Sequence, residues 1–202
     1  MRGLIERFRR NKVVTLDQDP RWRRFNGHGK PCSCCGRTLN GMFDIGFDHP
    51  DPWPYEARDK SGKDVLKFAK DYLSSDLCVI DGQAYVRAVV LLPVIEAEQS
   101  FGFGCWGSVS EDTFKQYLDS AENNAPFEGG FSWLSNILPT FEEAFDQSYV
   151  PCNLVASTDG QRPFLEAQEG PLAKAQRDGI TFDHLLDIYA ATGNDLRPHL
   201  LD

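Results

Sequence analysis

The chain has 202 residues and a formal net charge of −9, and 41% of its residues are hydrophobic. This length is enough for one domain with a proper core. Six irregularly spaced cysteines do not make a disulfide scaffold, and the N-terminal residues hold no apolar stretch typical of a secretory signal. No apolar run approaches the roughly 18 residues of a membrane span. We therefore expect a soluble cytoplasmic protein with reduced thiols.

The charge is divided unevenly along the chain. Residues 1–30 hold nine Arg and Lys residues against three Asp and Glu residues, so the remainder is strongly acidic. We expect this basic N-terminal arm either to dock on the acidic body or to stay mobile, and to touch nucleic acid only weakly. The predicted organisation is a basic arm at residues 1–30, one domain at residues 31–195 and a tail at residues 196–202 that frays.

The first predicted elements are a loop and a helix. Residues 47–54 contain three prolines within five positions, which forbids a helix or a central strand and predicts a rigid loop. From residue 61 to residue 73 the apolar side chains recur at helical spacing, with Ser61 as a plausible N-cap. This pattern predicts a surface helix.

After residue 73 the spacing of the apolar side chains changes from that of a helix to every second residue, which is typical of a strand. Residues 77–80 and 84–92 flank Asp81-Gly82, which predicts a hairpin with a type I′ turn because that turn needs positive φ angles. Residues 101–105 alternate aromatics with glycines and predict a third strand. The predicted core from these strands and the following segments includes Val89, Leu91, Phe101, Phe103, Trp106 and Trp133.

Helices and a second hairpin follow. A helix begins after Ser110, which acts as its N-cap with acidic residues in the first turn. The other predicted elements are a strand at 127–134, a short helix with a Thr140/Glu143 capping box, a hairpin of 149–156 with 163–167, and helices at 171–178 and 181–192. Tight hairpins imply antiparallel pairing, so the predicted fold class is α+β, a mainly antiparallel sheet with helices packed on it.

A set of different short motifs follows in a distinctive order along the chain. They are Cys32-x-x-Cys35-Gly36, Asp76-Leu-Cys-Val-Ile-Asp-Gly82, Val90-Leu-Leu-Pro-Val94, Trp106-Gly-Ser-Val-Ser110, Trp133-Leu-Ser-Asn136, Arg162-Pro163, Pro171-Leu-Ala and Gln176-Arg-Asp-Gly-Ile180. This order resembles the bacterial family catalogued as domain of unknown function 2199, over about residues 32–190. The family is functionally uncharacterised, so the resemblance implies no catalytic residue. Members often carry a His soon after the Cys-x-x-Cys-Gly motif, where residues 37–40 of this chain are Arg-Thr-Leu-Asn.

The segment Cys32-Ser-Cys-Cys-Gly36, the knuckle, has the spacing of half a metal site. A tight turn closed by glycine aims the sulfurs of Cys32 and Cys35 at one cation, but no second close pair follows. The predicted zinc ligands are Cys32, Cys35, His49 and Cys78, and Cys34 and His28 are further donors that would complete the set if the fold brings them close. A dithiol redox pair and a plain turn with partly buried thiols stay open as alternatives.

Two other segments invite a functional interpretation. Asp48-His49-Pro50-Asp51 places two carboxylates beside an imidazole on the stiff loop, a composition that suits a metal or a general base as well as a solvated polar loop. Gly102 to Gly107 spells G-x-G-x-x-G, but it lies inside a predicted strand instead of opening a helix, so we expect no nucleotide cofactor.

Two functions of different class follow from these residues. The first is a non-enzymatic protein-binding module that offers an acidic, aromatic-rich surface to a protein partner. The alternative is a metal-dependent, hydrolase-like enzyme built on Cys32, Cys35 and the His49 loop, for which the sequence names no catalytic residue. An ordered pocket that joins Cys32, Cys35 and His49 would favour the enzyme, and an acidic face with exposed aromatics would favour the binding module.

Overall fold

The computed structural model describes residues 15–28, 31–33, 35–57, 65–123, 125–145, 149–157 and 161–200. The strands are β1 (Ile45–Gly46), β2 (Leu66–Phe68), β3 (Asp71–Leu73), β4 (Leu77–Ile80), β5 (Gln83–Pro93), β6 (Ser100–Val109), β7 (Gly130–Leu134), β8 (Val150–Val155) and β9 (Phe164–Ala167). The helices are α1 (Pro20–Phe25), α2 (Glu111–Asn123), α3 (Gly170–Asp178) and α4 (Phe182–Ala191), with 3₁₀ turns η1 (Leu16–Gln18), η2 (Glu142–Phe145) and η3 (Arg197–His199).

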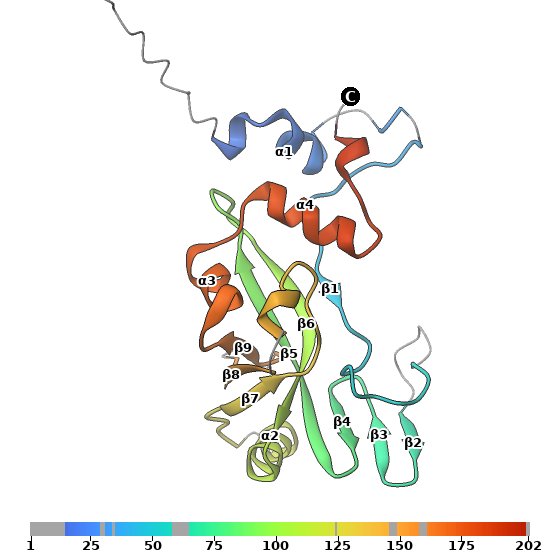
Figure 1. Ribbon diagram of the computed structural model, residues 1–202, viewed down its shortest axis with the longest axis vertical. Coiled ribbons are helices and arrows are strands. Elements are labelled where there is room, and N and C mark those ends of the chain that lie inside the picture. Colours follow the sequence, from blue (N-terminus) through green and yellow to red (C-terminus); the bar gives the residue numbers. More distant parts are fainter. Residues whose placement is uncertain are drawn as a thin grey trace, which may run out of the picture.

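Five consecutive strands close into a barrel. Strands β5 to β9 follow one another as antiparallel neighbours, and β9 returns to pair in parallel with β5 at Val89 and Phe164. An odd number of alternating strands requires one parallel contact at closure. The α+β class and the mainly antiparallel pairing are therefore confirmed, but the predicted sheet of hairpins is more than an open sheet, since five of its strands form a closed barrel with the others added at its side (Figure 1).

The turn chemistry read from the sequence holds in the described residues. Asp81 and Gly82 both have positive φ, 49° and 81°, as the predicted turn between β4 and β5 requires. Strands β8 and β9 pair as predicted, while the turn at residues 159–160 lies outside the described residues. The Ser110 hydroxyl accepts a hydrogen bond from the Thr113 amide at the start of α2.

The helix predicted for residues 61–73 is wrong where the structure describes it. Residues 66–68 and 71–73 form the β2–β3 hairpin, and residues 61–64 lie outside the described residues. Strand β3 pairs with β4, and Leu73 is fully buried beneath this extension of the sheet. Phe68 stacks on Tyr55 with ring centroids 4.2 Å apart. These contacts with distant residues outweigh a short helical pattern, which by itself does not decide between helix and strand.

Two hydrophobic clusters hold the barrel and its cover. The main cluster includes Phe101, Phe103, Cys105, Leu134, Leu154 and Leu165 from the barrel strands together with Leu185, Leu186 and Tyr189 of α4. The second packs Trp106 on the outer side of β6 against Trp53, Leu73, Cys78, Ile80 and Tyr85.

The core prediction holds only for some of its residues. Phe101, Phe103 and Trp106 are fully buried. Leu91 and Trp133 are 38% and 40% exposed, and Val89 is partly exposed. The prediction for Leu91 and Trp133 is wrong because successive strand residues face opposite sides, and these two alternate with the buried Val90, Leu92 and Leu134.

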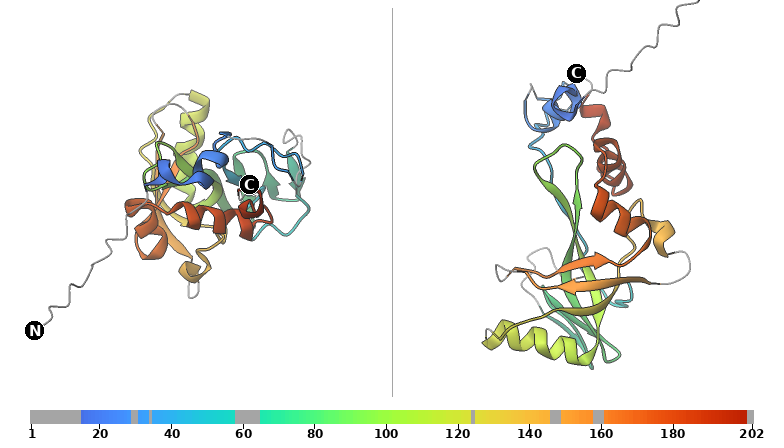
Figure 2. Two further views of the ribbon diagram at one scale, coloured as in Figure 1. Left: turned by 90° about the horizontal axis from the view of Figure 1, so that it is seen from above. Right: turned by 90° about the vertical axis from the view of Figure 1, so that its left-hand side faces the viewer.

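The described part of the N-terminal arm docks on the body. Phe25 of α1 is fully buried, and its ring lies 5.3 Å from that of Phe182 at the start of α4. Trp22 meets the same Phe182 ring edge-on at 5.0 Å. Helix α1 and the C-terminal turn η3 lie together at one end of the molecule, and α2 lies at the opposite end (Figures 1 and 2). Aromatic packing therefore holds the described part of the arm, in addition to any attraction between the basic arm and the acidic body.

Candidate metal centre

The Cys-x-x-Cys segment forms a closed turn. The Gly36 amide donates to the Cys32 carbonyl at 2.7 Å, and the Cys32 amide donates to the Arg37 carbonyl at 2.9 Å. Gly36 has a φ of +70°, a conformation that glycine adopts without the steric cost of a side chain. The backbone therefore turns at Gly36, and the turn brings the side chains of Cys32 and Cys35 to the same side.

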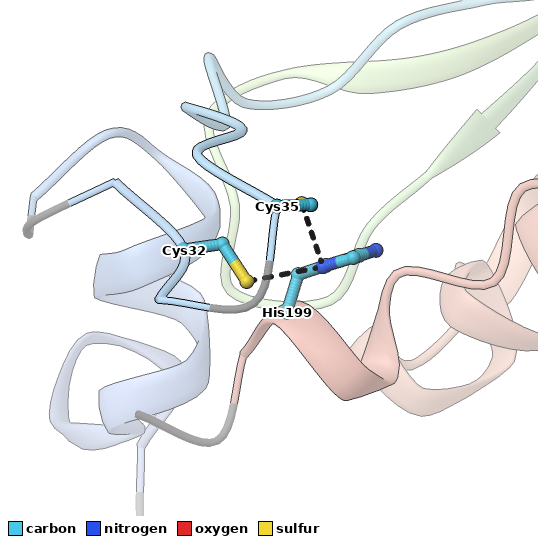
Figure 3. Close-up of side chains that lie close together, drawn as sticks. All are labelled: Cys32, Cys35 and His199. Carbon is cyan, nitrogen blue, oxygen red and sulfur yellow. Dashed lines mark hydrogen bonds between the residues drawn. The ribbon is translucent and has the colours of Figure 1, made fainter.

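His199 of η3 completes a group of three donors. Its Nδ1 atom lies 3.3 Å from the Cys32 sulfur and 3.6 Å from the Cys35 sulfur (Figure 3). All three donor atoms lie within 4.8 Å of one another. A tetrahedral zinc ion with its usual bonds to sulfur and nitrogen would hold these atoms about 3.5 Å apart. The nitrogen–sulfur distances thus already suit a zinc ion.

The C-terminal turn is fixed on both sides of this histidine. Leu196 and Leu200, which flank η3, are buried in the main hydrophobic cluster. The His199 carbonyl accepts a hydrogen bond from Nε of Arg24 in α1 at 2.6 Å. The expectation that the tail frays is therefore wrong for residues 196–200, because apolar burial and a cationic donor hold the backbone that carries the imidazole.

The segment after the knuckle is fixed to α4. The hydroxyl of Tyr189 donates to the Phe43 carbonyl at 2.9 Å and accepts from the Phe43 amide at 3.0 Å. The two rings stack at 4.3 Å, and burial raises the pKa of Tyr189 to about 12, which keeps the phenol protonated as a donor. The knuckle is thereby tied to the same helix that η3 follows.

The three donors differ in their exposure. Cys32 is buried, His199 is partly buried and Cys35 is exposed, so the group lies at the surface with one open side. Among the described residues no fourth His, Cys, Asp or Glu joins the group. Cys34, the donor adjacent in sequence, lies outside the described residues. A fourth position is thus available to water or to a donor beyond the described ranges.

The other two residues of the predicted ligand set lie elsewhere. Cys78 of β4 is fully buried in the second cluster, where burial raises the pKa of its thiol to about 12. The Nδ1 atom of His49 contacts the Pro50 carbonyl at 2.9 Å. Neither residue belongs to the described group of donors, and neither does His28, which is exposed just after α1. The structure brings together Cys32 and Cys35 of the predicted set and adds His199.

The His49 loop has a packing role of its own. The buried side chain of Asn136 donates to the His49 carbonyl at 3.0 Å and to Oδ1 of Asp51 at 2.8 Å. Its own oxygen accepts from the Trp106 amide at 2.9 Å. One buried amide therefore joins the proline-stiffened loop to β6 and helps to fix the shape of the loop.

Comparisons with known proteins give a family for this architecture. A family model described as "Uncharacterized protein conserved in bacteria (DUF2199)" matches residues 31–180. Comparisons with curated proteins and with solved structures found no match. In the described part of the chain, no helix is both long and apolar enough to cross a membrane. The matched residues include Cys32 and Cys35 but end before His199, so a signal for His199 has to come from the C-terminal residues themselves. The local signal is the pair of leucines, Leu196 and Leu200, which indicates an apolar anchor for this part of the chain but not its contact with the cysteines.

Proposed function

The chain belongs to the bacterial family DUF2199, whose description assigns no activity, and we propose from the site that it binds one zinc ion through Cys32, Cys35 and His199. The observation that carries this proposal is the approach of one imidazole nitrogen to two cysteine sulfurs at 3.3 and 3.6 Å. Two thiolates with an imidazole favour zinc over the oxygen-seeking ions magnesium and calcium.

The role we propose for this ion is that of a clasp. Cys32 and His199 are 167 positions apart, so one ion would join the start of the described body to its C-terminal turn. Arg24 of α1 already contacts the backbone of His199, so the ion would also hold the docked arm in place. Metal binding that requires a folded set of ligands contributes its free energy to the folded state.

A catalytic role has less support. The hydrolase alternative takes its base from the His49 loop, but His49 contacts Pro50 and its loop is joined to Asn136. His49 is also absent from the donor group of the described residues. The clasp uses the three residues that lie together, and water or a donor beyond the described ranges takes the fourth position of the zinc ion.

Metal analysis of the purified protein tests the clasp. Native mass spectrometry should find one zinc per chain, lost on chelation, and the C32S/C35S double variant and His199→Ala should each lose it. His49→Ala and His28→Ala are matched controls that should keep the metal. A metal retained by the double variant would refute the site, and a metal lost in His49→Ala would restore the ligand set predicted from the sequence.

A second candidate function rests on a different surface. Phe131 and Trp133 on the outer face of β7 are exposed and meet edge-to-face at 4.9 Å, and Ile137 and Tyr149 on the following segments are exposed as well. Rings exposed on an acidic chain suit the contact with a basic protein partner. We propose this face as the one a protein-binding module would use.

The binding face has a direct test. Isothermal titration calorimetry with cationic and with anionic amphipathic peptides should detect binding of the cationic peptides only. Trp133→Ala should abolish this binding, whereas Leu91→Ala, which truncates an exposed side chain outside the face, should preserve it. Equal binding by Trp133→Ala would exclude this face as the contact.

A further inference from the structure

The two cysteines of the zinc site differ in a way that bears on regulation. We infer that the clasp opens on oxidation: a hydroperoxide converts Cys32 and Cys35 into a disulfide, the zinc ion leaves, and His199 loses both of its sulfur partners. This inference rests on the proposed zinc site and names the signal that controls it.

Access favours Cys35 as the first residue to react. Cys35 is exposed, whereas Cys32 is buried a few ångströms away, with both sulfurs within 4.8 Å of one another. A buried thiol that lies beside an exposed one is placed to resolve the first oxidation product instead of meeting the oxidant itself. The two cysteines therefore have separate roles in one reaction.

The remaining described cysteines act as an internal contrast. Cys78, Cys105 and Cys152 are buried, and desolvation raises the pKa of each thiol, to about 12 for Cys78 and Cys152. A thiol reacts through its thiolate, so these three resist a dilute peroxide. Among the described cysteines, peroxide therefore reacts first with those of the knuckle.

The chemistry balances with a hydroperoxide as oxidant. The Cys35 thiolate attacks one peroxide oxygen, the O–O bond breaks, and Cys35 sulfenic acid and hydroxide form. The Cys32 thiolate then attacks the Cys35 sulfur and displaces a second hydroxide, which forms the S–S bond. Two thiolates have lost two electrons in total and the peroxide has gained them. The disulfide sulfurs carry no charge, so the zinc ion is released.

The structural consequence falls on the C-terminal turn. Among the described residues, the contacts of this turn that do not involve the knuckle include the Arg24 hydrogen bond to the His199 carbonyl, the ion pair of Arg197 with Asp187, and the burial of Leu196 and Leu200. Oxidation removes the zinc bond of the imidazole and leaves these contacts in place. We expect the C-terminal turn to open to solvent more often after oxidation, because one of its contacts is lost, while the barrel stays intact.

The test begins with zinc-loaded protein in a Cys34→Ser background, which removes the neighbouring thiol. Stoichiometric hydrogen peroxide should release one zinc ion, read with a chromogenic chelator, for each Cys32–Cys35 disulfide mapped by mass spectrometry. A thiol reductant with added zinc should reverse both changes. If Cys34→Ser fails to retain zinc, the same mapping is carried out on the natural sequence, where a disulfide from Cys34 in place of Cys32 contradicts the inference.

The outcomes separate this inference from the zinc site on which it rests. Protein that binds no zinc overturns both proposals. Zinc that stays bound while peroxide is consumed, or zinc released without a Cys32–Cys35 disulfide, overturns the redox inference alone. Hydrogen exchange gives the second readout: residues 194–200 should exchange faster after peroxide, to the level reached by chelation, and unchanged exchange would show that oxidation does not open the clasp.

Discussion

The barrel and the end that carries the candidate metal centre are stabilised by different means. In the barrel, β5 and β6 pair over ten residues of each strand and enclose fully buried side chains such as Phe103 and Cys105. At the other end, α1, the knuckle and η3 are short. Helix α1 meets α4 through an aromatic contact and an ion pair, and the knuckle meets η3 at the three metal donors. Long strand pairing and continuous apolar burial stabilise the first region, whereas the second consists of short elements that add only single side chains such as Phe25, Leu196 and Leu200 to the same hydrophobic cluster.

This difference predicts two levels of stability within one chain. A region held by a few contacts opens more readily than a continuous core, since opening exposes less apolar surface. The proposed metal site lies in the region that we expect to open more readily. Perturbing the barrel should therefore affect the whole protein, whereas perturbing the clasp should affect the ends first.

The largest effect is expected from the barrel interior. Phe103→Ala removes a fully buried ring and should reduce the free energy of unfolding by about 3–5 kcal/mol. Urea titration followed by fluorescence measures this loss, with Leu91→Ala as the control because that side chain faces out of the same sheet. An equal loss of unfolding free energy in both variants would mean that burial does not decide which of the two side chains contributes more to stability.

Zinc removal comes next in size. At free zinc one thousand times its dissociation constant, binding stabilises the folded state by about 4 kcal/mol, and chelation removes this contribution. We expect faster hydrogen exchange around residues 31–39 and 194–200, with little change in β5 and β6. Uniform acceleration across the barrel would show that the two regions do not differ as described.

The antiparallel sheet was the more predictable region because the pattern of its hairpins is local. Alternation and the Asp81-Gly82 turn predict the β4–β5 hairpin from adjacent residues, and both turn residues have the expected φ. Closure was not predictable in the same way, because the single pair Val89–Phe164 joins strands far apart in sequence. The same limit explains residues 66–73, where contacts with β4 and Tyr55 decide between helix and strand.

The metal centre shows this limit at a single site. Cys32 and Cys35 are neighbours, so their spacing alone indicates a shared turn. His199 joins them only after α4 and η3 bring the C-terminus back to the knuckle, and no local spacing encodes that return. His49 and Cys78 were nearer in sequence, but Asn136 and the second cluster hold them elsewhere.

Aromatic docking of the arm gives the third prediction. Phe25→Ala should cost about 3 kcal/mol, at the lower end for a buried ring, because α1 lies at the periphery and the site can relax. The loss should change little with salt, since no charge is removed. Chemical unfolding at low and at high salt measures this, and a loss that disappears at high salt would show that charge, not packing, holds the arm.

The smallest effect is expected from the ion pair beside those rings. Arg21 donates to Asp183 at 2.7 Å, but its side chain is 36% exposed and that of Asp183 is 69% exposed, so solvent screens the pair. Arg21 also bonds Asp19 and lowers the pKa of that carboxyl, so one partner remains when Asp183 is lost. We expect a coupling energy below about 1 kcal/mol from a double-mutant cycle of Arg21→Gln and Asp183→Asn. Roughly 1 M salt shortens the Debye length to about 3 Å and should remove most of it. A coupling as large as the effect of Phe25→Ala would mean that electrostatics, and not aromatic packing, governs the clasp end of the molecule.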